Sequence, residues 1–149
     1  MPRPSEGALE RALRNAERNG VAARVAVERA NAMHDLRDRA ARGERYGMVV
    51  VDPPAFARSR RELEGALRGY RELNRRALAL CEAGGVLVSA SCSHNVGRDD
   101  FVAALAAAAL EETCDARVFA LTGASADHPV LAGLPESEYL KCAFVRVAK

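Results

Sequence analysis

The chain has 149 residues, of which 49% are hydrophobic and 28% are charged, and its formal net charge is +2. This composition is typical of one globular domain and excludes a disordered chain, while so small a net charge favours no oppositely charged partner. The N-terminal residues lack the apolar core of a signal peptide, and the longest apolar run, 101–110, is too short to span a bilayer. We therefore predict a single domain over residues 1–149 that does not enter a membrane.

The four cysteines, Cys81, Cys92, Cys114 and Cys142, stand among apolar neighbours, and no two of them have Cys-x-x-Cys spacing. Zinc sites and disulfide frameworks have characteristic cysteine spacings, and this sequence has neither. The cysteine pattern therefore predicts that the protein holds no metal and belongs to the reducing cytoplasm.

The first half of the chain predicts helices and strands in alternation. Ser5 is suited to cap a helix over 5–18, because apolar residues recur at helical spacing after it. A short apolar segment at 23–27 predicts a strand, and 33–42 predicts a polar helix. The β-branched run at 48–51 has no polar alternation, which is typical of a strand covered on both faces of a parallel sheet. The two prolines that follow this run oppose further ladder pairing.

The second half continues the alternation. Apolar residues at helical spacing predict a long helix over 60–82, which Gly84 and Gly85 would end. The remaining predicted elements are a strand, a helix and two strands, at 86–90, 99–110, 117–121 and 139–147. Strands that alternate with helices predict an α/β sheet with right-handed crossovers. The last two strands have no helix between them, so we expect them to pair antiparallel.

Chemically distinctive residues follow two of the predicted strands. The sequence Asp-Pro-Pro-Ala-Phe at 52–56 follows one strand, and Ser-Cys-Ser-His at 91–94 follows another. Ligands of open α/β sheets bind beyond the carboxyl ends of the strands. If the two strands are neighbours, an acid, a proline corner, an aromatic ring and a thiol converge on one crevice.

These side chains also have structural interpretations. A single cysteine is often a small buried hydrophobe, but the place of Cys92 after an apolar strand, between two serines, favours a reactive thiol. Asp52 is either an acid of the site or the cap of the following turn. His94 and His128 are general-base candidates because imidazole as a group titrates near neutrality, although a structural or substrate-positioning role is favoured for both. The other three cysteines are interpreted as core residues.

Five motifs in order resemble a known family. They are Val-Val-Val-Asp-Pro-Pro-Ala-Phe at 49–56, Gly-Tyr-Arg-Glu-Leu-Asn at 69–74, Gly-Gly at 84–85 with Ser-Cys-Ser at 91–93, Asp-His-Pro at 127–129 and Tyr-Leu-Lys at 139–141. From about residue 5 to the end, their order and spacing resemble the C-terminal part of the bacterial 23S rRNA cytosine-C5 methyltransferases, which are S-adenosylmethionine-dependent class I enzymes. Asp-Pro-Pro alone is not specific, whereas the ordered set is.

The resemblance implies a class I methyltransferase (Rossmann-like) sheet, S-adenosylmethionine as cofactor and 23S rRNA as substrate. By this resemblance Cys92 is the nucleophile that adds to C6 of the target cytosine, and Asp52 is the main supporting residue. Addition at C6 makes C5 able to accept the methyl group, and Phe56 would stack on the extruded base. The implied cofactor-binding residues are Asn31, Asp52 and Pro53, and the implied substrate-binding residues are Pro54, Phe56, Ser91 and Ser93.

The sequence departs from the family at the cofactor site. It has no Gly-x-Gly, the family's ribose-binding acid aligns near Arg3, and Asn31 stands where the family has an adenine-binding Asp. The resemblance therefore implies an N-terminally truncated domain that lacks the first two strands of the sheet. We expect this chain alone to bind the cofactor weakly or not at all. We also expect exposed strand edges that pair with an N-terminal half or with a second copy.

Two other functions stay open. An amino-methyltransferase would use Asp-Pro-Pro to hold an exocyclic amine and would not need Cys92. A non-catalytic remnant, or half of a split enzyme, would have no activity by itself. The stretch 58–76 carries seven Arg against three Glu, which suits contacts with RNA phosphates and equally suits a solvated helix face with Glu–Arg pairs.

Overall fold

The structure is a computed structural model, and it describes residues 6–57, 59–134 and 137–149. It divides into two compact units, Met1–Asp35 and Leu36–Lys149, and each unit is described by itself. Among the described residues, no helix has both the length and the apolar character needed to cross a membrane.

The first unit contains the helix α1 (Glu6–Arg18), the 3-10 turn η1 (Ala22–Arg24) and the start of α2 (Ala32–Ala41). The helix predicted over 5–18 is thus confirmed from Glu6 onward, and its predicted cap, Ser5, lies outside the described residues. The strand predicted at 23–27 is wrong. Val25 follows the 3-10 turn in extended conformation and is 36% exposed. An apolar segment becomes a strand only when a neighbouring strand supplies hydrogen bonds, and no described strand pairs with this one.

The second unit holds the sheet and its helices. After the end of α2, its elements are β1 (Tyr46–Val51), η2 (Arg60–Glu62), α3 (Leu63–Leu80), β2 (Cys81–Ser91), α4 (Arg98–Glu111), β3 (Asp115–Thr122) and β4 (Lys141–Ala148). Their order is the predicted order, and the predicted α/β class is confirmed.

The four strands form one mixed sheet in the order β1-β2-β4-β3. β1 and β2 are parallel, with Val49 opposite Leu87, whereas β4 runs antiparallel to both β2 and β3. The antiparallel pairing predicted for the last two strands is therefore confirmed. Among the described residues β1 pairs with β2 alone, so its other edge is open.

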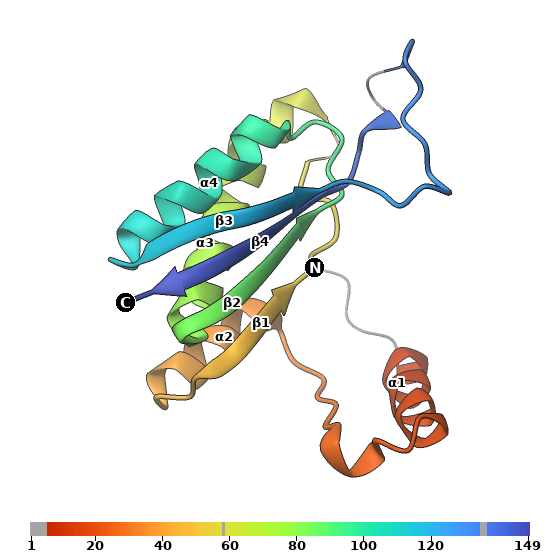
Figure 1. Cartoon of the computed structure of the whole chain (residues 1–149), viewed down its shortest axis with the longest axis vertical. Helices are drawn as coiled ribbons and strands as arrows, with labels where there is room; N and C mark the ends of the chain where they lie inside the picture. The colour runs from red at the N-terminus through yellow and green to blue at the C-terminus, as the bar shows by residue number, and fades with distance from the viewer. Residues whose placement is uncertain (1–5, 58, 135–136) are drawn as a thin grey trace. The chain divides into compact units, whose positions relative to one another are not determined.

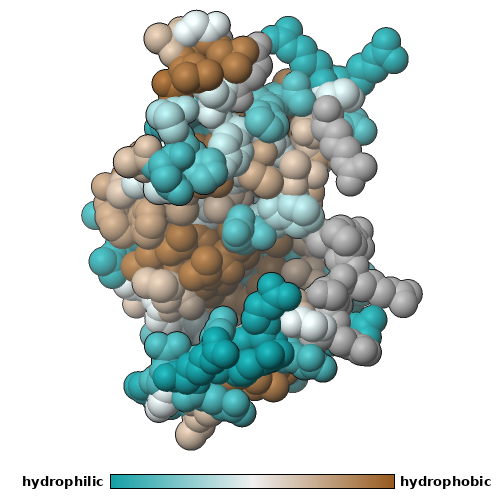
Figure 2. All heavy atoms as spheres, turned by 90° about the vertical axis from the view of Figure 1, so that its right-hand side faces the viewer, coloured by the Kyte–Doolittle hydropathy of each residue, from teal (hydrophilic) through white to brown (hydrophobic). Residues whose placement is uncertain are grey.

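The two faces of this sheet differ. Helices α3 and α4 lie on the same side of the sheet (Figure 1), and they cover Val49, Leu87 and Val145, all 9% exposed or less. On the other face, Met48 is 59% exposed and Val50 is 62% exposed. Figure 2, a side view of the molecule, shows hydrophobic side chains in brown at the molecular surface. The expectation that 48–51 is covered on both faces is thus wrong for this chain, because alternate side chains point to the open face.

The end of α3 differs from the prediction. The helix ends at Leu80, and Gly84 and Gly85 lie inside β2, where the register with β1 shifts. Gly84 has a φ of +78°, a conformation that favours glycine. A Cβ at Gly85 would lie 3.1 Å from the carbonyl oxygen of Gly47. These glycines therefore permit a bulge in the strand and do not end the helix.

Candidate functional site

The carboxyl ends of β1 and β2 lie side by side, as the site prediction requires. Val51 is paired with Ser89, so the segments that follow both strands start at the same edge of the sheet. There the Cys92 thiol donates a hydrogen bond to the carbonyl oxygen of Pro53, at a sulfur–oxygen distance of 3.9 Å. The thiol and the proline corner, 39 residues apart in sequence, are therefore in direct contact.

Ser93 fastens the segment after β1 to the end of β2. Its hydroxyl oxygen accepts hydrogen bonds from the backbone N–H groups of Phe56, at 3.0 Å, and Ala57, at 3.4 Å. The side chain is fully buried, so these bonds are shielded from water. Ser93 thus fixes the backbone that carries Phe56 next to the residue that follows Cys92.

Tyr70 of α3 completes this arrangement from the helix layer. Its hydroxyl is 2.9 Å from the Ser93 hydroxyl and accepts a hydrogen bond from the Ser91 hydroxyl at 2.8 Å. Its ring packs against Phe56, with ring centroids 4.7 Å apart. Gly69 makes room for this pair, because a Cβ there would lie 3.1 Å from the Phe56 ring. The sequence reading gave Tyr70 no role, although it lies in one of the five motifs.

Lys141, the first residue of β4, is a second site residue that the sequence reading missed. Its side chain is 2% exposed, and its ammonium nitrogen donates to the carbonyl oxygens of Ser93, at 2.7 Å, and Val96, at 2.6 Å. Burial lowers the pKa of Lys141, whereas the charge on Cys92 raises it. Burial is what makes Lys141 unusual for a lysine, and burial becomes visible only in the folded structure, so the sequence offered no signal for it.

The structure places the predicted site residues in two environments. Asp52 and Pro54 are exposed, and Cys92 and Phe56 are half-buried. Burial and the Asp52 charge both raise the pKa of the Cys142 thiol, and a hydrogen bond with Thr122 opposes them. The remaining predicted residues, Pro53, Ser91 and Ser93, are buried. Contact between Ser91 or Ser93 and substrate stays a prediction, since their hydroxyls bond within the protein.

Asn31 lies in the first unit, where it caps α2. Its side-chain oxygen accepts hydrogen bonds from the backbone N–H groups of Met33, at 3.1 Å, and His34, at 3.3 Å. These bonds leave the two amide protons of the Asn31 side chain for other acceptors. The structure therefore gives Asn31 a helix-capping role in addition to its predicted contact with the cofactor.

The two histidines considered as general bases lie in different surroundings. His94 is exposed, and its ring centroid is 5.4 Å from that of Tyr139. His128 is also exposed and lies 3.3 Å from the Asp127 carboxylate. In the part of the chain that the structure describes, no group of three or more His, Cys, Asp or Glu side chains is placed to hold a metal ion.

The arginines of α3 make ion pairs with acidic residues. Arg75 and Arg76 both bind the Glu72 carboxylate, at 2.9 and 2.6 Å, and Arg71 lies 3.3 Å from Glu111 of α4. The hydrogen bond from Arg75, followed by the one from Arg76, lowers the pKa of Glu72 to about 2. The described geometry favours the interpretation of this stretch as a solvated, ion-paired helix face.

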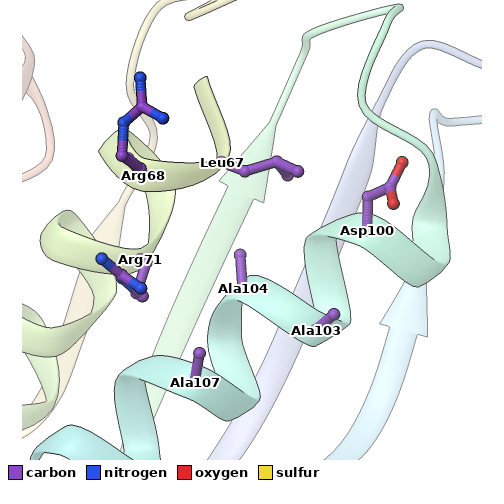
Figure 3. A pocket seen from close by; sticks show the side chains of 7 residues that line it. All are labelled: Leu67, Arg68, Arg71, Asp100, Ala103, Ala104 and Ala107. Atoms are coloured by element: carbon purple, nitrogen blue, oxygen red, sulfur yellow. The ribbon is translucent and has the colours of Figure 1, made fainter. Parts of the chain in front are cut away.

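A groove of about 210 Å³ lies between α3 and α4, and none of the predicted site residues is among those that line it. Figure 3 shows the lining residues of this groove: Leu67, Arg68 and Arg71 come from α3, and the Leu67 side chain extends toward α4. The α4 residues in the lining are Asp100, Ala103, Ala104 and Ala107.

The chain is similar to ribosomal RNA methyltransferases over nearly all of its length. It is 38% identical over 143 residues to ribosomal RNA large subunit methyltransferase I of Aeromonas salmonicida, and 37% identical over 138 residues to that of Serratia proteamaculans. The matches cover 95% and 92% of this chain but only 36% and 35% of those proteins. The chain thus spans about a third of the length of these relatives. No family model matches the chain.

Two solved structures share the fold. One is the candidate methyltransferase SMU.776 in complex with SAH, with a TM-score of 0.74 and 16% identity. The other is a candidate SAM-dependent methyltransferase from Streptococcus mutans, with a TM-score of 0.73 and 14% identity. Each match covers 95% of this chain, and 37% and 36% of those chains. The predicted Rossmann-like class I methyltransferase fold is therefore confirmed for the part of the fold that this chain contains.

Proposed function

We propose that this chain forms part of an S-adenosylmethionine-dependent methyltransferase that modifies C5 of a cytosine in 23S rRNA. The observation that carries the proposal is the contact between the Cys92 thiol and the carbonyl of Pro53. It joins the two motifs that such chemistry needs, at the strand ends where α/β folds bind ligands. The similarity to ribosomal RNA large subunit methyltransferases supports the choice of substrate.

The thiol has a definite task in this chemistry. C5 of cytosine is a poor nucleophile, so the Cys92 thiolate first adds to C6 and forms a carbon–sulfur bond. The displaced electron pair makes C5 nucleophilic enough to accept the methyl group. Loss of the C5 proton and cleavage of the carbon–sulfur bond then restore the aromatic ring and the thiolate. The groups around Cys92 serve to keep its sulfur in place during these steps.

The buried contacts supply that positional control. Ser93 binds the backbone of Phe56 and Ala57, and Tyr70 binds Ser93, so the loop with Phe56 cannot move independently of the loop with Cys92. Phe56 already rests on the Tyr70 ring and leaves part of its surface exposed for a base extruded from RNA. Ser91 supports this arrangement through its bond to Tyr70.

The residues proposed for the cofactor fit it in part. Asp52 presents an exposed carboxylate next to the buried Pro53, and Asn31 keeps two amide protons for an acceptor such as an adenine nitrogen. The cofactor, when bound, supplies the sulfonium methyl group. The sequence has no Gly-x-Gly turn at which backbone could approach the cofactor closely. We therefore expect these 149 residues by themselves to bind it weakly or not at all.

The test replaces the aligned 143 residues of the Aeromonas salmonicida relative with this chain. Methyl transfer from labelled S-adenosylmethionine to a 23S rRNA transcript is then measured for the chimera and two variants. Cys92→Ala should lower the rate at least about a hundredfold, because the covalent step is lost. Cys142→Ala, the matched control, should keep the rate within about twofold. Nucleoside analysis should locate the label on cytosine C5.

Retention of activity by Cys92→Ala, with the label on an exocyclic amine, would instead identify an amino-methyltransferase. In that reaction Asp-Pro-Pro alone would hold the target. A chimera without methyl transfer, beside an active parent relative, would contradict the proposal and favour a non-catalytic remnant.

We also propose that the open edge of β1 pairs with further polypeptide, either an N-terminal half or, in this chain by itself, a second copy. The edge offers unpaired backbone groups beside the exposed Met48 and Val50. Sedimentation velocity should show concentration-dependent association of the chain. Val50→Lys should suppress it, because a charge on an edge strand opposes pairing. A chain that stays monomeric at every concentration would contradict self-association.

A further inference from the structure

Lys141 is a buried cation whose two bonding partners are neutral. The side chain is 2% exposed, and both acceptors of its ammonium group are backbone carbonyls, those of Ser93 and Val96. Lysine is rarely this buried without an acidic partner, because removing an ammonium group from water is costly. Hydrogen bonds to two neutral carbonyls offset only part of that cost.

The two carbonyls bracket the segment that follows Cys92. Ser93 comes directly after the cysteine, and the backbone N–H of Val96 bonds back to the Ser93 carbonyl at 3.2 Å. Lys141 is also paired with Ser91 across the sheet. The ammonium group therefore holds the loop that directly follows Cys92, through backbone atoms that every side-chain variant of this loop would keep.

Two other charged groups that act on Lys141 have opposite signs and are paired with each other. Glu138 and Arg98 form an ion pair at 2.5 Å, and the charges of both act on Lys141. Asp52 is exposed at the end of β1, and His94 is exposed in the loop after β2. Burial is the main influence that lowers the pKa of Lys141, and the charge of Cys92 is the first of those that raise it. A negative charge at Cys92 therefore favours the ammonium form of Lys141.

We propose that Lys141 is a positioning residue for Cys92, which holds the loop after the cysteine and supplies the positive charge that favours its thiolate. A catalytic effect of Lys141 rests on the proposed function, in which Cys92 is the nucleophile. When the thiolate forms, the thiol proton passes to solvent and the negative charge stays on sulfur, one residue before the Ser93 carbonyl that binds the ammonium group. Lys141 gains no covalent bond and transfers no proton in this role.

Iodoacetamide tests this role without cofactor or RNA, because it alkylates thiolates far faster than thiols. The rate at Cys92 is followed by peptide mass spectrometry in the folded 149-residue chain at about pH 8. Lys141→Met, which removes the charge and keeps an apolar stem, should slow alkylation of Cys92 about tenfold. In guanidinium-unfolded chains the variant and the parent should react at equal rates.

Lys149→Met is the matched control. Lys149 is the only other lysine, and it also donates to two backbone carbonyls, those of Ala79 and Cys81 at 3.3 and 3.1 Å. It lies at the opposite end of β4, so its loss should leave the Cys92 rate within about twofold of the parent rate.

The direction of the change separates electrostatics from structure. If Lys141 only holds the loop, its replacement exposes Cys92 and alkylation becomes faster, approaching the rate of the unfolded chain. A faster or unchanged rate would therefore overturn the proposal. The result is independent of the methyl-transfer test, since thiol alkylation is measurable even if Cys92→Ala retains methyl transfer.

Discussion

The helix-covered face and the open face of the same sheet carry similar apolar residues in different environments. Leu87, on the covered face, is fully buried, whereas Met48 and Val50, on the neighbouring strand, are more than half exposed. Backbone pairing is therefore enough to define β1, but only α3 and α4 create a core. The site benefits from that core, because Tyr70 reaches Ser91 and Ser93 from the covered side.

The substitution with the largest expected effect tests whether the side chains on the covered face provide most of the folding stability. Leu87→Ala should lower the free energy of unfolding by about 2–5 kcal/mol, because it opens a cavity beneath the helices. Met48→Ala removes an exposed side chain and should change it by less than about 0.5 kcal/mol. Urea denaturation of both variants gives the two values. Equal losses would show that the open face is also covered in solution and would contradict the difference between the two faces.

A smaller effect concerns the outer surface of α3. The pKa of Glu72 falls from 4.5 to about 2, first through the hydrogen bond from Arg75. A carboxyl whose pKa is lower in the folded state stabilises the fold above its unfolded pKa, and this stability is lost as the pH falls from about 4.5 toward 2. Because Glu72 is about a third exposed, we expect a contribution of only ~0.5 kcal/mol.

Glu72→Gln provides the measurement. Its free energy of unfolding should lie slightly below that of the parent chain at neutral pH, and the two should converge near the lower end of that pH range. A difference that grows as the pH falls would have the wrong sign and would contradict the ion-pair assignment. A difference as large as that of Leu87→Ala would show that the helix surface, and not the covered core, dominates stability.

Local patterns predicted most of the elements correctly. The β-branched run ending at Val51 and the helical repeat of α3 both form as expected, because their apolar spacing matches the period of the element. The segment with Val25 has a similar apolar character but no partner strand, and it forms a 3-10 turn and an extended stretch. The Gly84-Gly85 pair predicts a break in regular structure. In the fold this break is a bulge within β2, where the register with β1 shifts.

The order of the elements, the α/β class and the two strand ends that carry Asp52 and Cys92 could all be predicted from the amino-acid sequence alone. These features follow from local periodicity and from which residue types follow each strand. Only the tertiary structure placed Tyr70 and Lys141 at the site, because their roles depend on contacts with Ser93 across distances of 23 and 48 residues in the chain. Burial and long-range hydrogen bonding are properties of the packed sheet, and no local pattern encodes them.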